Sequence, residues 1–210
     1  MKKLLVEFIG AFFLVLTVGM TVINPDPGLG ACGPLAIGSA MMIMVYAGAH
    51  VSGGHYNPAI TVAIWLRGRC PTADVAPYIG AQLAAGVVAA LAVMALKGDP
   101  TIAHDDVRIA PALIGEFLGT FALCYVVLNV ATAKGTAGNS HYGLAIGFTL
   151  MTMIYALGPL SLGAFNPAVA TGLIVLHKVA AANIWIYFFS ELGAAVFAAV
   201  AFKFINPDDK

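Results

Sequence analysis

A repeat without gaps constrains the fold of this chain more than any other feature of its sequence. The stretch "LAIGSAMMIMVYA" at 35–47 returns 109 positions later as "LAIGFTLMTMIYA" at 144–156. The same offset relates four further pairs: Asn57 and Asn166, Glu7 and Glu116, Gly10 and Gly119, and Gln82 and Glu191. Because one offset connects motifs along almost the whole chain, we expect a single domain over 1–210 that contains two copies, at about 1–96 and about 110–205.

The composition indicates a membrane protein. Of the 210 residues, 60% are hydrophobic and only 10% are charged, and the mean hydropathy is +0.92. A soluble domain has roughly 25% charged residues, so we expect a chain that crosses the bilayer several times. The formal net charge is zero, and nothing in this balance indicates a nucleic-acid partner. The three cysteines have no metal-ligand spacing and, being odd in number, predict no disulfide framework.

Six apolar stretches are long enough to cross a bilayer as helices. They lie at roughly 4–23, 34–50, 75–96, 110–133, 142–159 and 182–205, and turn-rich stretches separate several of them, at 24–33, 97–108 and 134–141. The first begins "MKKLLVEFIG", which resembles a signal peptide, but its length and the lack of a clear cleavage site favour a retained span. Each copy of the repeat contains three spans, and an odd number inserts the two copies in opposite orientations. The predicted fold class is therefore an all-α membrane protein with six transmembrane helices in an inverted 3+3 repeat.

Two further apolar stretches, at about 57–66 and 166–176, are too short to span the bilayer. Each begins with Asn-Pro-Ala. Asn is a preferred helix N-cap, and Pro suits the first helical position because its missing amide would have no partner there. We therefore expect two re-entrant half-helices that start inside the membrane, and such segments at matching positions of inverted repeats indicate a transport site. The residues that begin them are Asn57, Pro58, Ala59, Asn166, Pro167 and Ala168.

The distribution of Lys and Arg predicts the orientation. With the N-terminus in the cytoplasm, the cytoplasmic side holds Lys2, Lys3, Arg67, Arg69, Lys134, Lys203 and Lys210. The outer side holds Lys97, Arg108 and Lys178. The positive-inside rule then favours cytoplasmic N- and C-termini, and we expect the cell membrane as the location. In this orientation the two half-helices enter from opposite sides and meet near the midplane.

At "SGGHYNPAIT" and "GAFNPAVATG" the sequence resembles the two signature loops of the major intrinsic proteins, the aquaporin and aquaglyceroporin family. The resemblance covers essentially the whole chain and includes the intramembrane acids Glu7 and Glu116. It implies a passive channel for water or small neutral solutes, with no enzyme activity, cofactor or metal. It also implies a homotetramer with one pore per subunit. Small residues expected on the packing faces agree with this: Gly10, Gly80, Gly86 and Gly119.

The expected pore has a positive centre with polar backbone on either side. Each half-helix carries roughly half a positive charge at its N-terminus, which repels cations where two such ends meet, and the Asn57 and Asn166 amides can donate to a passing oxygen. Unwound carbonyls in the preceding loops can accept from the permeant, because irregular backbone at membrane depth is tolerated where it lines a cavity. These loop residues are Gly53, Gly54, His55, Leu162, Gly163 and Ala164. By the resemblance, His55 also lines the cytoplasmic vestibule.

The chain departs from the family pattern at the outer constriction. Most members have Arg directly after the second Asn-Pro-Ala, whereas this chain has Val169. The resemblance implies a selectivity filter of Ile37, Ile154, Gly163 and Val169. These residues offer no charge, aromatic ring or side-chain donor, so we expect a wider, apolar constriction that slows water by partial dewetting. It should pass glycerol, urea, ammonia or hydrogen peroxide, unless a loop cation, Arg108 or Lys178, supplies the missing charge.

Glu7 and Glu116 are interpreted as structural groups rather than as pore-lining groups. Intramembrane acids are functional candidates by default, but here no cationic partner is evident. Their carboxylates can brace the re-entrant loops by accepting backbone amides, and Gln82 and Glu191 have the same interpretation. His50 and His55 lack the further partners that a metal site needs.

Two other classes of membrane protein remain as alternatives. Broken helices in inverted repeats also occur in coupled secondary transporters, which need an ion gradient that a channel does not need. A poorly conducting scaffold-type member of the family would show no flux even when well folded. No nucleophile–base pair, phosphate-binding loop or metal-ligand cluster indicates an enzyme.

Overall fold

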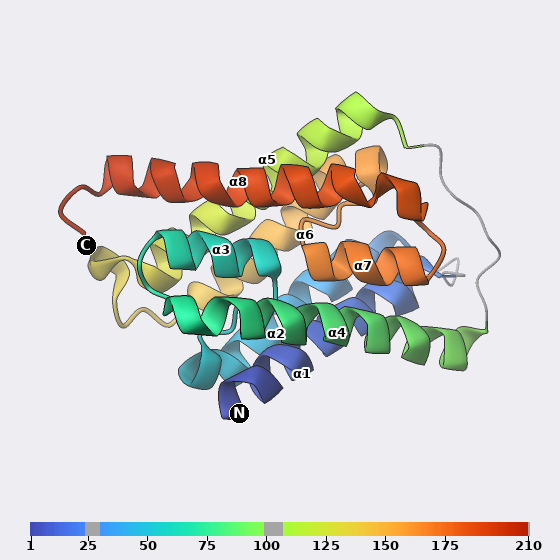
Figure 1. Ribbon diagram of the computed structural model, residues 1–210, viewed down its shortest axis with the longest axis horizontal. Helices are drawn as coiled ribbons and strands as arrows, with labels where there is room; N and C mark the ends of the chain where they lie inside the picture. Colours follow the sequence, from blue (N-terminus) through green and yellow to red (C-terminus); the bar gives the residue numbers. More distant parts are fainter. Residues whose placement is uncertain (24–29, 99–106, 210) are drawn as a thin grey trace.

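The computed structural model of the protein describes residues 1–23, 30–98 and 107–209 (Figure 1). All the secondary structure within these residues is helical. The greater part of the turn-rich stretches predicted at 24–33 and 97–108, together with Lys210, lies outside the described residues.

Six helices confirm the six predicted spans, because each is long and apolar enough to cross a membrane. They are α1 (Lys2–Val22), α2 (Gly33–Ser52), α4 (Thr72–Lys97), α5 (Ile109–Val127), α6 (Tyr142–Ser161) and α8 (Ile184–Ile205). The predicted span at 110–133 is α5 followed by a π-helix, Leu128–Thr132. Short 3₁₀ turns also occur, at Gly30–Cys32, Lys134–Thr136 and Ala181–Asn183. The helix predicted to end at 159 continues to Ser161, with Pro159 in its last turn.

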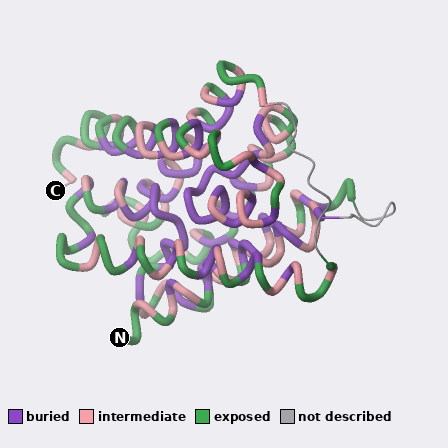
Figure 2. The backbone as a smooth tube through the Cα atoms, turned by 45° about the vertical axis from the view of Figure 1, so that its right-hand side comes forward, coloured by how far each residue is buried: buried purple, intermediate pink, exposed green. Residues whose placement is uncertain are grey.

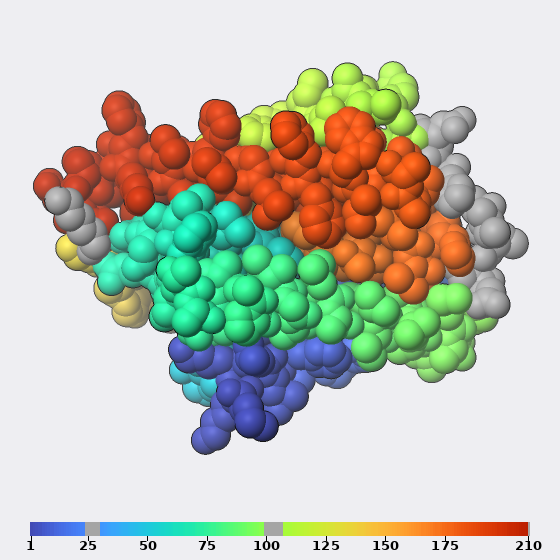
Figure 3. Space-filling view, in the orientation of Figure 1, coloured from blue at the N-terminus to red at the C-terminus, as the bar shows by residue number. Residues whose placement is uncertain are grey.

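The two short helices are α3 (Pro58–Leu66) and α7 (Pro167–Val175), and each has nine residues. In Figure 1, α3 lies in the half of the bundle that carries both chain termini, and α7 lies in the opposite half. The two helices contact each other, and each also packs against α4 and α8. Figure 3 shows the face on which they lie between α8 and α4.

The packing of the long helices follows the repeat. α1 packs against α2 and α4, and α5 packs in the same way against α6 and α8. Where α2 and α6 cross, Gly38 faces Gly147, which lies 109 positions later. A Cβ atom on either glycine would come within 2.6 Å of the carbonyl oxygen of the other. Only glycine therefore permits this approach between the two copies.

Apolar side chains cover the outside of the bundle, while polar side chains are buried within it. Large exposed hydrophobic residues include Phe13, Leu118, Phe148, Phe189 and Phe197, as a lipid-facing surface requires. Buried positions gather in the middle of the molecule (Figure 2). They include the polar residues Glu7, Asn57, Thr61, Gln82, Glu116, Asn166 and Glu191. Because buried polar groups need hydrogen-bond partners, these residues identify the region that positions the site.

Candidate functional site

Each half-helix begins at an asparagine that caps it. Asn57 has extended backbone, and its Oδ1 accepts from the amides of Ala59 at 2.8 Å and Ile60 at 3.4 Å. Asn166 is extended too, and its Oδ1 accepts from the amide of Ala168 at 2.9 Å. Pro58 and Pro167 occupy the first helical positions, where no amide is needed. The asparagine oxygens are therefore committed to their own helices.

The asparagine nitrogens bind the opposite loop. Asn57 Nδ2 donates to the carbonyl of Phe165 at 2.9 Å, and Asn166 Nδ2 donates to the carbonyl of Tyr56 at 3.0 Å. These crossed hydrogen bonds join the two copies at their centre and orient both amides. Because a side-chain amide has two N–H groups, each asparagine keeps one donor for a further acceptor. The sequence analysis did not anticipate the crossed bonds.

The loop before each half-helix follows the same backbone path in both copies. Gly53 and Gly54 have φ of 94° and 65°, and their counterparts Leu162 and Gly163 have φ of 71° and 62°. Tyr56 and Phe165, the residues before the two asparagines, also have positive φ, of 50° and 47°. Such left-handed residues break the helical pattern, so the carbonyls of these loops are free of helical hydrogen bonds.

Three of the four small residues expected between subunits pack inside the subunit instead, and that expectation was wrong for them. A Cβ atom on Gly10 would clash with the ring of Tyr56, and one on Gly119 would clash with the ring of Phe165. Gly86 lies against the carbonyl oxygen of Ala168. These glycines make room for the loops and the second half-helix. Gly80 alone of the four is exposed with open space around its Cα.

Glu7 lies beneath the first loop. Its Oε1 accepts from the Ser52 hydroxyl at 2.6 Å and the His55 amide at 3.0 Å. Its Oε2 accepts from the Tyr56 amide and from Gln82 Nε2, each at 2.7 Å. One carboxylate thus holds two successive loop amides and two side chains.

Glu116 occupies the matching place beneath the second loop. Its Oε1 accepts from the Ser161 hydroxyl at 2.6 Å and the Ala164 amide at 3.0 Å, and its Oε2 accepts from the Phe165 amide at 2.7 Å. Glu191, the counterpart of Gln82, accepts the Asn166 amide through Oε1 at 2.8 Å. Glu7, Gln82, Glu116 and Glu191 are not among the described lining residues of the two cavities described next.

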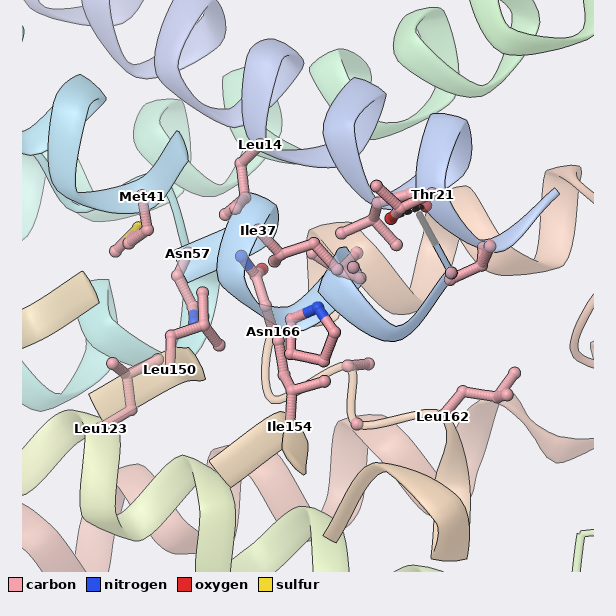
Figure 4. A pocket seen from close by; sticks show the side chains of 18 residues that line it. Leu14, Thr21, Ile37, Met41, Asn57, Leu123, Leu150, Ile154, Leu162 and Asn166 are labelled. Carbon is pink, nitrogen blue, oxygen red and sulfur yellow. Dashed lines mark hydrogen bonds between the residues drawn. The ribbon is translucent and has the colours of Figure 1, made fainter. Parts of the chain in front are cut away.

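A cavity of about 120 Å³ adjoins both asparagines (Figure 4). All four residues of the expected filter line it: Ile37, Ile154, Gly163 and Val169. Leu162 and Ala164 of the second loop line it too, as do Leu14, Met41, Leu123 and Leu150 near the asparagines. Among the described residues of this lining none is charged, and neither Arg108 nor Lys178 belongs to it. The wall of this filter cavity is therefore mainly apolar.

Thr21 is a polar lining residue that the sequence analysis missed. Its hydroxyl donates to the carbonyls of Thr17 at 2.9 Å and Val18 at 3.0 Å. Its hydrogen is therefore used within α1, and only its oxygen lone pairs are available to a permeant. The expected filter rests on the resemblance, which includes no position on the first span and therefore does not indicate Thr21.

A second cavity, of about 720 Å³, lies on the other side of the loops and is called the vestibule here. Gly53, Gly54 and His55 of the first loop line it, together with His50 and the basic residues Arg69 and Lys134. His55 Nδ1 lies 3.1 Å from the Thr61 hydroxyl. The two loops thus face different cavities, with the asparagine pair next to the filter cavity.

Asp209 ties together the segments at the rim of the vestibule. Its carboxylate lies 2.6 Å from the Arg67 guanidinium and 3.6 Å from that of Arg69. It also accepts from the Lys134 backbone amide at 2.7 Å. The hydrogen bond from this amide is the largest cause of the lowered pKa of Asp209. Burial opposes the shift, and the Arg67 charge lowers the pKa further. The C-terminal segment is thereby held to the loops that follow α3 and α5.

Within the described ranges, no group of three or more His, Cys, Asp or Glu side chains lies close enough to hold a metal ion. Cys32 is exposed, while Cys70 and Cys124 are buried, and all three are free thiols.

Comparisons with known proteins agree with this geometry. The family model described as "Major intrinsic protein" matches residues 1–202. Aquaporin NIP1-3 of Oryza sativa subsp. japonica is 35% identical over 227 residues, which cover 100% of this chain and 75% of the relative. Glycerol uptake facilitator protein-like 6 of Lactiplantibacillus plantarum is 34% identical over 219 residues and is covered completely, as is this chain. The solved aquaglyceroporin of Plasmodium falciparum has the same fold, with a TM-score of 0.72 at 20% identity over 99% of this chain and 95% of its own.

Proposed function

Since the chain belongs to the major intrinsic protein family, we propose that its two half-helices and their loops line one pore per subunit. This pore passes water and small uncharged solutes and excludes ions. Membership of this family makes the protein a passive membrane channel for water and small solutes, not an enzyme. Residues 1–210 then form a single channel domain. The proposed path of the permeant runs through the vestibule, the asparagine pair and the filter cavity, in that order.

At the centre of the proposed pore, a permeant oxygen accepts from the remaining N–H groups of Asn57 and Asn166. The crossed hydrogen bonds hold these groups in place, so they need no reorganisation as the permeant passes. The N-terminal ends of α3 and α7 each contribute roughly half a positive charge. This charge repels cations, and a hydrated ion also loses water in an apolar wall without compensation.

The observation that best supports the solute profile is the filter cavity. It contains Ile37, Ile154, Gly163 and Val169 without a charged residue in the described lining. Apart from the remaining N–H groups of Asn57 and Asn166, the polar groups available there are acceptors, namely the Thr21 oxygen and the loop carbonyls. We therefore assign to this filter small neutral solutes, such as glycerol, urea, ammonia or hydrogen peroxide. Water crosses this apolar constriction with fewer compensating hydrogen bonds than a polar filter with Arg would offer, and hence more slowly.

Stopped-flow light scattering on proteoliposomes tests this profile. Water, glycerol and urea fluxes are measured for the wild type, for Val169→Arg and for Val169→Leu, which adds bulk without charge. Val169→Arg introduces a donor and a positive charge, so its ratio of solute flux to water flux should fall well below that of Val169→Leu. An unchanged ratio in a folded variant would place the filter elsewhere.

The same preparation separates the channel from its alternatives. Flux that continues without any ion gradient contradicts a coupled transporter. Absence of all flux from a well-folded sample would favour a scaffold-type protein.

Three further assignments belong to this proposal. The N- and C-termini face the cytoplasm, as the positive-inside rule favours, and the location is the cell membrane. The assembly is a homotetramer, which the family suggests, although the glycines buried within the subunit no longer support it. Crosslinking in native membranes and protease access from each side measure the assembly and the orientation.

A further inference from the structure

Two carboxyl groups meet where α5 packs against α8. Glu116 and Glu191 are both fully buried, and their side chains are within hydrogen-bonding contact. At the matching place in the first copy, a carboxylate meets an amide instead, because Glu7 contacts Gln82. The two copies thus differ at this position by the exchange of a single –NH₂ group for an oxygen.

The amide in the first copy identifies what this position must do. Gln82 Nε2 donates to Glu7 Oε2 at 2.7 Å. In the second copy, Glu191 Oε1 is occupied by the Asn166 amide at 2.8 Å. The other oxygen, Glu191 Oε2, is buried and has no donor within reach in the described structure.

An ionised Glu191 would not suit these surroundings. Its Oε2 would be a buried anionic oxygen without a partner. The Glu191 side chain also contacts a second carboxyl group, and two carboxylates sharing one site cannot both ionise readily. A protonated Glu191 removes both problems, because a carboxylic acid has an O–H donor that occupies the role of the Gln82 N–H. Among the described residues, no basic side chain forms a hydrogen bond with either acid.

We propose that Glu191 carries a proton and donates it in a hydrogen bond to the Glu116 carboxylate. The pair then holds one negative charge, and Glu191 acts as a positioning residue for Asn166. Through Oε1 it holds the Asn166 backbone, and through the proton it is itself held by the carboxylate that braces the second loop. The functional part of this inference rests on the proposed pore role of Asn166.

The proton also makes the two copies electrostatically equivalent. Glu7 with neutral Gln82 places one negative charge beside the first half-helix, and Glu116 with neutral Glu191 places one beside the second. A second charge there would weaken the positive end of α7, which is part of the proposed barrier to cations. Titratable groups near the pair include Cys124 on α5, on which a Glu191 charge would act, and Tyr187 on α8, which donates to the Ser161 carbonyl.

Infrared difference spectroscopy of the full-length protein in lipid tests the charge state without reference to transport. At neutral pH the wild type should show the carbonyl stretch of a protonated carboxyl group, and Glu191→Gln should lose this band. Absence of the band in the wild type, or its persistence in Glu191→Gln, would overturn the proposal. If Glu191→Gln does not fold, Gln82→Glu provides the second test, because it builds the same pair in the first copy and should add a band of the same kind.

Flux measurements test the positioning role. Glu191→Gln keeps both hydrogen bonds and should match the wild type in water flux near neutral pH, whereas Glu191→Leu loses both and should have lower flux. At alkaline pH the wild-type flux should fall reversibly as the pair loses its proton, while that of Glu191→Gln should not. An equal alkaline loss in both proteins would contradict the role of the proton. If Asn166 lines no pore, the infrared band remains but no variant alters flux, so the two failures are distinguishable.

Discussion

The two re-entrant loops share one scaffold and face two cavities of different chemistry. In both, a buried glutamate accepts two successive loop amides, and a positive-φ path ends at an asparagine that caps a nine-residue helix. Yet the first loop faces a vestibule with two histidines, Arg69 and Lys134, while the second faces a cavity whose described lining has no charge. The backbone geometry is thus carried by the repeated residues, and the chemistry of each side is carried by the residues that differ.

The shared scaffold is tested most severely by removing the two acids. Glu7→Leu removes the acceptor of four buried donor groups, of which Gln82 Nε2 keeps the Thr61 hydroxyl as a second acceptor. Glu116→Leu removes the acceptor of three, and also that of the proton proposed on Glu191. Each unpaired buried donor costs about 1–3 kcal/mol. Both variants should therefore unfold at far lower temperature than the wild type. Thermal unfolding in mild detergent measures this, with the exposed Leu5→Ala on α1 as the control. Wild-type stability in either variant would show that the acid does not brace its loop.

A smaller effect separates the loops at their first residue. Gly53 and Leu162 occupy matching positions with φ of 94° and 71°, a region that costs a residue with a Cβ atom about 1–2 kcal/mol. Gly53→Ala should therefore destabilise the protein, and the new Cβ would also meet His55 Nε2 at 3.0 Å. Leu162→Gly should be neutral or slightly stabilising, because it relieves the backbone while losing a partly buried side chain. Equal destabilisation by both substitutions would mean that backbone strain does not distinguish the loops.

The smallest expected effect concerns the charged residues at the rim of the vestibule. Because the pKa of Asp209 is lowered in the folded protein, its stabilising contribution is complete above the ordinary carboxyl pKa of about 4 and is lost as the pH falls through the lowered value. Hydrogen exchange at the Lys134 amide, which donates to Asp209, should lose protection over that range. Asp209→Asn should exchange faster at neutral pH and approach the wild type in acid. Equal protection in both proteins at neutral pH would show that Asp209 does not hold this loop.

Much of the fold was accessible from the sequence because its signals are local or periodic. The length of an apolar run decides whether a helix can cross a bilayer, and Asn-Pro determines where a short helix can begin. The offset of 109 positions then paired Glu7 with Glu116 and Asn57 with Asn166 before any contact was known. The structure places each of these pairs in equivalent hydrogen bonds.

Other features depended on distances between residues far apart in the chain. The sequence assigned Gly10 and Gly119 to contacts between subunits, but only the packed loops show that the rings of Tyr56 and Phe165 occupy the space beside them. Thr21 reaches the filter cavity because α1 ends beside the second loop, which no spacing in the first span indicates.

Taken alone, the sequence determined that this chain has six spans and two half-helices that begin with Asn-Pro, and it has Val169 where the resemblance implies Arg. The tertiary structure decided which polar groups satisfy one another. It joined each asparagine to the opposite loop and brought Glu191 against Glu116. The reason is physical: apolar periodicity and capping act within a few residues of the chain, whereas the partner of a buried polar group is set by whichever helix is packed against it.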